Sequence, residues 1–173
     1  MEFTSLTDGL LLAARTRNHE AADRYAARLR DLLARQPETV TPLDEARYHL
    51  ALAERELYRG TPEGARAALE MLQHLERDTR LGRVAVREPS FYVLRAAAFG
   101  QLYKQAKIQN DDGQKDQMAG AAMQTIHLAQ LARQDEWLRY LADPKRTRTQ
   151  DSDDDLVELA KDRPEVRSLL GLS

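Results

Sequence analysis

The sequence of 173 residues contains no cysteine, few aromatic residues and no long apolar run. Without cysteine the chain forms neither disulfides nor thiolate metal sites, and it has no cysteine nucleophile. No stretch approaches the ~18 to 20 apolar residues of a membrane span. The first residues, 1–15, lack the basic and long apolar regions of a signal peptide. We therefore expect a cytoplasmic protein with no membrane partner.

An excess of one charge sign is also absent. The formal net charge is −2, although charged residues make up 31 % of the chain. No overall field therefore draws the molecule to nucleic acid or to an anionic membrane, and nucleic acid is a poor candidate partner. Apolar residues at 42 % are typical of a folded domain with a heavily charged surface.

The residues that are present favour helices. Ala, Leu, Arg, Glu and Gln recur, whereas Val and Ile are scarce. Apolar residues follow three-and-four spacing along most of the chain, which is typical of amphipathic helices. We predict an all-α fold with three antiparallel helical hairpins, at 3–35, 42–76 and 90–134.

Local signals mark the ends of several helices. Asn18 and Thr41 precede helical runs and are suited to cap them. The stretch Gly60-Thr61-Pro62 combines a residue that ends a helix, a cap and a first helical residue. So short a connection requires the two helices that it joins to fold back on one another.

The remaining segments are less regular. Residues 77–89 carry four arginines, and their apolar residues predict a short extended piece or a packed loop. We predict a helical array over 1–141, a polar linker over 142–155 and capping helices over 156–173.

No motif for chemistry emerges. Asp151, Asp153 and Asp155 have the spacing of a calcium loop, but Leu156 replaces the required glycine and Asp162 the required glutamate. We interpret this run as an acidic helix cap. We predict no catalytic residue, no metal, no cofactor and no enzyme activity. The histidines are too far apart in the chain for a helical zinc pair: His19, His49, His74 and His127.

The middle hairpin resembles the tetratricopeptide (TPR) repeat family. Leu52-Ala53 match the Leu-Gly of its first helix, Gly60 its turn glycine, and Ala65, Leu69 and Leu72 its second helix. His49 and Glu56 depart from its tryptophan and tyrosine positions, the closing proline is absent, and the period exceeds the family's ~34 residues. The resemblance implies a right-handed array of hairpins over 3–134. The alternative is a plain six-helix bundle.

The resemblance also implies a concave groove lined by the first helix of each hairpin. A peptide or a partner helix would bind there, and tyrosine and arginine are the residue types most enriched at such contacts. The alternative for helix 90–107 is that its aromatic residues fill a core. The implied partner-binding positions are Arg47, Glu54, Tyr58, Tyr92, Arg95, Phe99 and Tyr103, accompanied by Leu11, Arg15, Leu50, Leu57 and Leu102.

The sequence therefore predicts a non-catalytic protein-binding module, an adaptor, chaperone or sensor scaffold. Two alternatives remain. One is a self-associating bundle, in which helix 90–107 supplies the apolar face of a homodimer. The other is a nucleic-acid-binding protein that uses the arginines of 77–87 and the basic residues of 145–148.

Overall fold

The computed structural model describes residues 2–146 and 155–172, and within them the fold is all-α. Its elements are α1 (Glu2–Arg15), α2 (His19–Arg35), η1 (Pro37–Thr39), α3 (Pro42–Leu57), α4 (Pro62–Arg77), α5 (Gly82–Ala85), α6 (Ser90–Ile108), α7 (Asp112–Leu131), α8 (Glu136–Ala142), α9 (Asp155–Asp162) and α10 (Pro164–Leu170). The predicted all-α class is confirmed. The helices α1–α2, α3–α4 and α6–α7 correspond to the ranges expected for the hairpins, and the first two pairs pack side by side.

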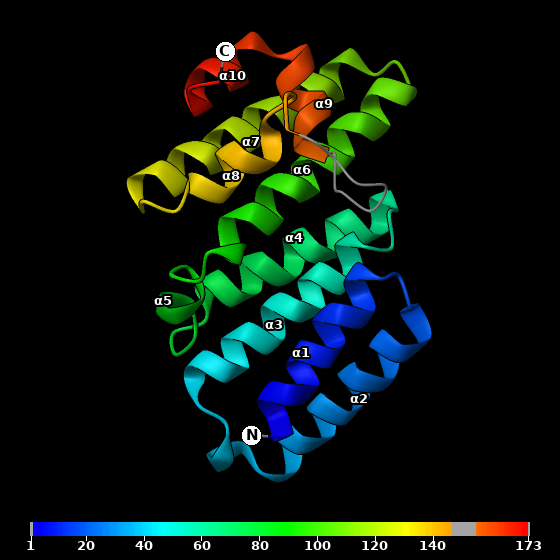
Figure 1. Cartoon of the computed structure of the whole chain (residues 1–173), viewed down its shortest axis with the longest axis vertical. Helices are drawn as coiled ribbons and strands as arrows, with labels where there is room; N and C mark the ends of the chain where they lie inside the picture. The colour runs from blue at the N-terminus through cyan, green and yellow to red at the C-terminus, as the bar shows by residue number, and fades with distance from the viewer. Residues whose placement is uncertain (1, 147–154, 173) are drawn as a thin grey trace. The chain divides into compact units, whose positions relative to one another are not determined.

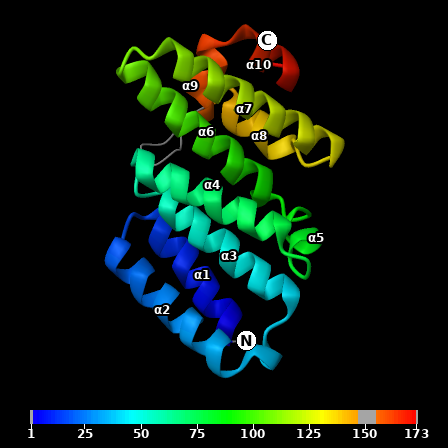
Figure 2. The same cartoon turned by 180° about the vertical axis from the view of Figure 1, so that it is seen from behind.

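The chain forms two compact units, Met1–Phe91 and Tyr92–Ser173. In the first unit α1 packs against α2, α3 packs against α4, and α1 lies beside α3 (Figures 1 and 2). One cluster of its core lies between α1, α2 and the middle of α3. The largest side chains of this core include Phe3, Leu10, Leu29 and Tyr48.

The helix ends in this unit follow from single residues. Asn18 Oδ1 accepts a hydrogen bond from the Ala21 N–H at 3.1 Å, and Thr41 Oγ1 accepts from the Asp44 N–H at 3.1 Å. Gly60 has a φ of 69°, and Thr61 Oγ1 accepts from the Gly64 N–H at 3.0 Å. These contacts confirm the predicted caps and the predicted turn between α3 and α4.

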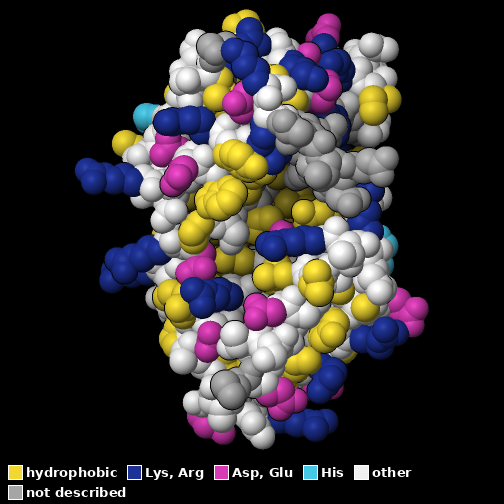
Figure 3. All heavy atoms as spheres, in the orientation of Figure 1, with side chains coloured by type: hydrophobic (Ala, Val, Ile, Leu, Met, Phe, Trp, Pro, Cys, Tyr) yellow, Lys and Arg dark blue, Asp and Glu magenta, His cyan; other side chains and the backbone are white. Residues whose placement is uncertain are grey.

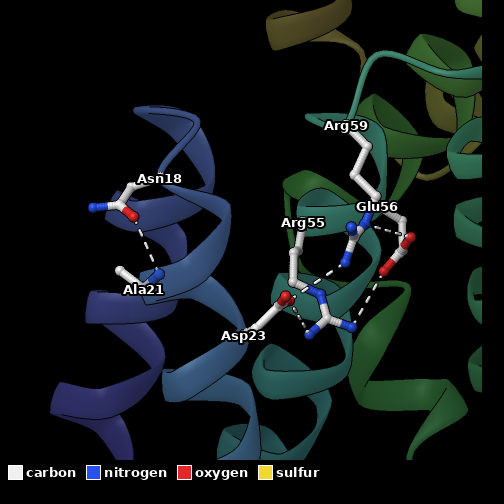
Figure 4. A network of polar contacts seen from close by, with 6 residues as sticks. All are labelled: Asn18, Ala21, Asp23, Arg55, Glu56 and Arg59. Atoms are coloured by element: carbon white, nitrogen blue, oxygen red, sulfur yellow. Dashed lines mark hydrogen bonds and ion pairs between the residues drawn. The ribbon is translucent and has the colours of Figure 1, made fainter.

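A polar network joins α2 to α3. Figure 4 shows Asp23 of α2 pointing toward Arg55 and Arg59. Asp23 Oδ1 accepts hydrogen bonds from both guanidinium groups, at 3.4 and 3.3 Å. Glu56 in turn lies 3.2 Å from Arg55 Nη2 and 3.0 Å from Arg59 Nε. One acidic residue on α2 therefore contacts Arg55 in the last turn of α3 and Arg59 just beyond it.

The segment 77–89 differs from the prediction of an extended piece or loop, because it contains the short helix α5. Asp78 Oδ1 accepts from the N–H groups of Arg80 and Leu81, each at 2.8 Å, and turns the chain. Leu81 and Ala85 are then buried, with 2 % and 0 % of their surfaces exposed. The local hydrogen bonds that Asp78 accepts therefore outweigh the preference of the two valines in this segment for extended backbone.

The second unit contains α7, α8, α9, α10 and the greater part of α6. Here α10 packs on α7 and α9, and α8 packs on α9. Lys107 Nζ on α6 lies 3.1 Å from Glu158 Oε2 and 2.8 Å from Asp162 Oδ2 on α9. The helices predicted as a separate cap over 156–173 therefore share one compact unit with α7. Of the predicted linker, residues 147–154 lie outside the described residues.

Candidate functional site

The helices α1 and α3 run in the same direction, side by side. Near the start of α1 the ring of Phe3 packs edge-on against Tyr48, with centroids 5.7 Å apart. At the end of α1, Arg15 reaches Glu54 in the last turn of α3. Two parallel helices in contact present two ridges of side chains with a groove between them.

A pocket of about 260 Å³ lies in this groove. Its α1 residues are 4, 7, 8, 11 and 15, and its α3 residues are 44, 47, 50, 51 and 54. Their recurrence at intervals of three and four places each set on one helical face. From residue 4 to residue 15 the groove extends for about 16 Å, at 1.5 Å of rise per residue. The lining residues are Thr4, Thr7, Asp8, Leu11 and Arg15 of α1, Asp44, Arg47, Leu50, Ala51 and Glu54 of α3, and Glu88 and Ser90.

The floor of the pocket is apolar. Leu50 and Ala51 are buried, with 3 % and 0 % of their surfaces exposed, and Leu11 is half-buried against the core of the first unit. These side chains offer a partner an apolar surface that is already anchored by packing. Docking there needs little reorganisation of the protein.

One end of the pocket is formed by an ion pair between Arg15 and Glu54. Arg15 Nε donates to Glu54 Oε1 at 2.9 Å, and Nη2 donates to Oε2 at 3.4 Å. Glu54 is buried, with 8 % of its surface exposed, whereas the Arg15 side chain is 56 % exposed. The hydrogen bond to Glu54 raises the pKa of Arg15, so this end of the groove presents a fixed guanidinium group.

A second ion pair, between Arg47 and Glu88, forms one wall. Arg47 Nε donates to Glu88 Oε2 at 3.1 Å, and half of the Arg47 side chain is exposed. Within the described residues, the structure shows no further hydrogen bond from Arg47 or Arg15 beyond those to Glu88 and Glu54. Each guanidinium group has five N–H donors, so both keep donors for a ligand.

Two further carboxylates line the pocket. Asp8 is exposed on α1, and in the described part of the chain its carboxylate has no ion-pair or hydrogen-bond partner. Asp44 is half-buried in the first turn of α3, where its Oδ2 accepts a hydrogen bond from Thr41 Oγ1 at 2.9 Å. Neither carboxylate is neutralised by a cation in the described residues.

Five of the positions that the sequence assigned to a groove do line this pocket, and they come from the first helices of the first two hairpins. They are Leu11, Arg15, Arg47, Leu50 and Glu54. Leu57 and Tyr58 were also assigned to it but are not among the lining residues, since Leu57 is buried and Tyr58 is half-buried at the end of α3.

The predicted positions on α6 are placed differently. Tyr103 has 2 % of its surface exposed, and its hydroxyl donates to Asp162 Oδ2 at 3.0 Å. The guanidinium of Arg163 lies 5.5 Å from the Tyr103 ring centre. Tyr103 is therefore a core residue that holds α9, and its assignment to a groove is corrected. Tyr92 is also buried, while Arg95 and Phe99 are half-buried.

The sequence missed the other lining residues of the pocket. Thr4, Thr7 and Asp8 share the helical face of Leu11 and Arg15, so the three-and-four spacing of α1 contained a signal for them. Glu88 follows the short helix α5, whose fold the sequence did not predict. No local pattern places that carboxylate beside Arg47.

The structure also describes the surfaces that nucleic-acid binding and self-association, the two alternative functions, would use. Arg80 pairs with Glu45, so the arginines of 77–87 are not a set of unpaired cations. Acidic and basic side chains are interspersed over the face shown in Figure 3. Of the apolar residues of α6 proposed for a dimer face, Phe91, Leu94 and Leu102 are buried and Phe99 is half-buried. In α8, by contrast, Trp137 and Tyr140 are 55 % and 51 % exposed.

The two histidines of the second hairpin differ in exposure. His49 is half-buried, and burial lowers its pKa although Glu45 opposes this, whereas His74 is exposed. Residues 2–146 and 155–172 contain no group of three or more His, Cys, Asp or Glu side chains placed to hold a metal ion. Asp151 and Asp153 of the calcium-like spacing lie outside those residues, and Asp155 pairs with Lys104 at 3.1 Å.

Comparison of the chain with family models, curated proteins and solved structures finds no match. Among the helices of the described residues, none has both the length and the apolar character that a bilayer crossing needs.

Proposed function

We propose that this protein is a non-catalytic, cytoplasmic protein-binding module, and that the groove between α1 and α3 takes a peptide segment of a partner. The observation that carries this proposal is the pocket itself, in which two parallel helices supply an apolar floor and a rim of anchored charges. An adaptor or scaffold with TPR-like hairpins would use its first helices in this way.

The dimensions of the groove favour a peptide over a small molecule. Its volume of about 260 Å³ lies below the range of about 300 to 1,000 Å³ that is typical of small-molecule sites. Its length of about 16 Å matches about five residues of extended chain at 3.3 Å per residue. One or two side chains of such a segment would fill the pocket, while its backbone lies along the groove.

The exposed arginines support the same mode of binding. An extended peptide presents carbonyl oxygens at every residue, and these need donors when they leave water. Arg15 and Arg47 are each held by a carboxylate, so their remaining N–H groups are already oriented. Binding then immobilises few additional side chains, which lowers its entropic cost.

A displayed library of random twelve-residue peptides tests the proposal. Peptides selected on the immobilised protein are synthesised, and their affinities are measured for the wild type, for Leu11→Ala and for Leu12→Ala. Leu11 lines the pocket, whereas its neighbour Leu12 is 66 % exposed and does not line it. We expect Leu11→Ala to weaken binding about tenfold or more and Leu12→Ala to leave it within about twofold.

Because Leu11 also contacts the core, thermal melts must show that both variants are folded. Arg47→Ala provides a second test on an exposed side chain, with Arg24→Ala on α2 as its control. Peptides that bind all of these variants equally would contradict the proposed function.

Self-association is a second candidate function, and a different surface favours it. Trp137 and Tyr140 of α8 form an exposed edge-to-face pair with ring centres 5.7 Å apart, and Leu131 is 70 % exposed. Exposed aromatic and aliphatic side chains of this size are typical of interaction surfaces. Sedimentation of the wild type and of Trp137→Ala tests this candidate, and a monomer at all concentrations of the wild type would contradict it.

A further inference from the structure

We infer that the segment bound in the α1–α3 groove is basic, and that Asp8 and Asp44 receive its cationic side chain. This inference rests on the proposed function and adds the chemistry of the partner. The occupant is a segment of another protein that carries Lys or Arg beside an apolar residue.

The charge of the pocket lining carries the argument. Two guanidinium groups and four carboxylates line the pocket, a formal charge of −2. The whole chain also has a formal charge of −2, so the groove alone holds an imbalance as large as that of all 173 residues. A positive ligand group is attracted there, and a negative one is repelled.

The excess negative charge of the pocket lining belongs to particular residues. Glu54 and Glu88 are each satisfied by an arginine, at 2.9 and 3.1 Å. Asp8 and Asp44 are the two lining carboxylates without a cation in the described residues. Asp44 has one oxygen engaged by Thr41 and keeps the other for a ligand, and the Asp8 carboxylate keeps both.

Asp44 also stabilises the start of α3, because a carboxylate in the first turn interacts favourably with the helix dipole. That role leaves its net charge in place. Asp8 lies in the middle of α1, where neither a cap nor an ion pair of the described chain involves it. Asp8 is therefore the more sensitive reporter of a cationic ligand group.

The order of groups along the groove predicts the pattern of the peptide. In each helix the aspartate without a cation precedes the lining leucine, because Asp8 comes before Leu11 in α1 and Asp44 comes before Leu50 in α3. The guanidinium of Arg15 marks the other end. A basic side chain at the acidic end, an apolar side chain on the leucines and a backbone carbonyl at Arg15 satisfy all three parts together.

The same random twelve-residue library provides the test. Peptides whose binding is lost in Leu11→Ala are sequenced, and their content of Lys and Arg is compared with that of the unselected library. Their affinities are then measured for the wild type, Asp8→Asn, Asp44→Asn and the control Asp31→Asn. Asp31→Asn makes the same charge change on the exposed surface of α2.

We expect enrichment of Lys and Arg among these peptides. Asp8→Asn should weaken their binding roughly two- to fivefold, as removal of a partly exposed charge does. Asp31→Asn should leave the affinity unchanged. Raising the salt concentration from about 0.05 to about 0.5 M should weaken binding to the wild type more than binding to Asp8→Asn.

Two contrary outcomes are distinguishable. Peptides that depend on Leu11 but show no basic enrichment, or that bind Asp8→Asn and Asp44→Asn as tightly as the wild type, overturn this inference and leave the proposed function standing. A selection that yields no peptide dependent on Leu11 overturns the proposed function, and this inference with it.

Discussion

Arg15 and Glu54 join the first helices of two successive hairpins, with Arg15 Nε 2.9 Å from Glu54 Oε1. The carboxylate is almost covered, while the guanidinium is more than half exposed. A carboxylate in that position depends on its partner, because its own contact with water is small. The pair therefore fixes the register of α1 on α3, and with it one end of the groove.

Removing Arg15 should destabilise the first unit. We expect Arg15→Met to lower the free energy of unfolding by about 1–2 kcal/mol, since a hydrogen-bonded charge loses its partner. Glu54→Gln in the Arg15→Met background should recover part of that loss. The control is Arg24→Met, which breaks the exposed pair with Glu20 and should change stability by less than about 0.5 kcal/mol. Urea unfolding measures all four proteins. Equal losses in Arg15→Met and Arg24→Met would contradict a structural role for the pair.

Three glycines should respond to alanine in three different ways. A Cβ at Gly64 would lie 2.3 Å from the Glu56 carbonyl oxygen. Gly64→Ala should therefore force α4 away from α3 and lower the free energy of unfolding by about 3 kcal/mol. Gly60 has space but a φ of 69°, so Gly60→Ala should cost about 1 kcal/mol. Gly120 lies within α7 with nothing near its Cβ position, and Gly120→Ala should stabilise by about 0.5–1 kcal/mol.

Thermal unfolding of the three variants checks these values. Gly60→Asn is the matched control, since asparagine tolerates the left-handed conformation better than alanine does. A Gly64→Ala protein as stable as the wild type would show that α3 and α4 do not approach as closely as described.

Tyr103 should behave as a core residue. Tyr103→Phe removes the hydroxyl that donates to Asp162 and should lower the free energy of unfolding by about 1 kcal/mol. Tyr103→Ala leaves a cavity and should cost about 3–5 kcal/mol. Neither change touches the α1–α3 groove, so selected peptides should bind the folded Tyr103→Phe protein with unchanged affinity. A loss of peptide binding in Tyr103→Phe, with stability unaltered, would restore this tyrosine to the binding surface.

The contacts of Asp162 should make stability fall in acid. Burial raises the pKa of this carboxyl. The hydrogen bonds from Lys107 and Tyr103 lower the pKa by more than burial raises it, so the net shift is downward. A group with a lowered folded pKa stabilises the fold above its ordinary pKa of about 3.9, and the contribution is lost as the pH falls through the folded pKa. The wild type should therefore exceed Asp162→Asn in stability by a constant amount from about pH 7 to 5, with the gap closing below about pH 4.

Chemical unfolding of both proteins at a series of pH values measures that gap. Hydrogen bonds to Asp162 and Glu158 raise the pKa of Lys107, so the contribution of this lysine is present below its ordinary pKa and lost only at still higher pH. Glu70→Gln, a change on the exposed surface in the interior of α4, is the control. A gap that does not change between pH 6 and 3 would contradict the described contacts of Asp162.

The sequence predicted the helix ends well, because a cap depends on only a few neighbouring residues. Asn18, Thr41 and Thr61 each bond an N–H group three residues ahead. The positions of α1 and α3 that line the groove could also be predicted from the sequence. The resemblance indicates that the first helix of each hairpin lines a groove, and the three-and-four spacing indicates which face of each helix does so. Tyr103 was misassigned because its surroundings depend on α9, which is more than fifty residues away in the chain. Glu88 was missed because its position depends on the cap at Asp78 and the turn that follows.

The proposed binding surface is tested most directly by a heteronuclear NMR titration of the wild type with a peptide selected from the library. The groove predicts that the largest shifts fall on amides of α1 and α3, among them Leu11, Ala51 and Glu54, and that the amides of α8 around Trp137 stay unchanged. Shifts confined to α8 or to α2, with those of α1 and α3 unmoved, would contradict it.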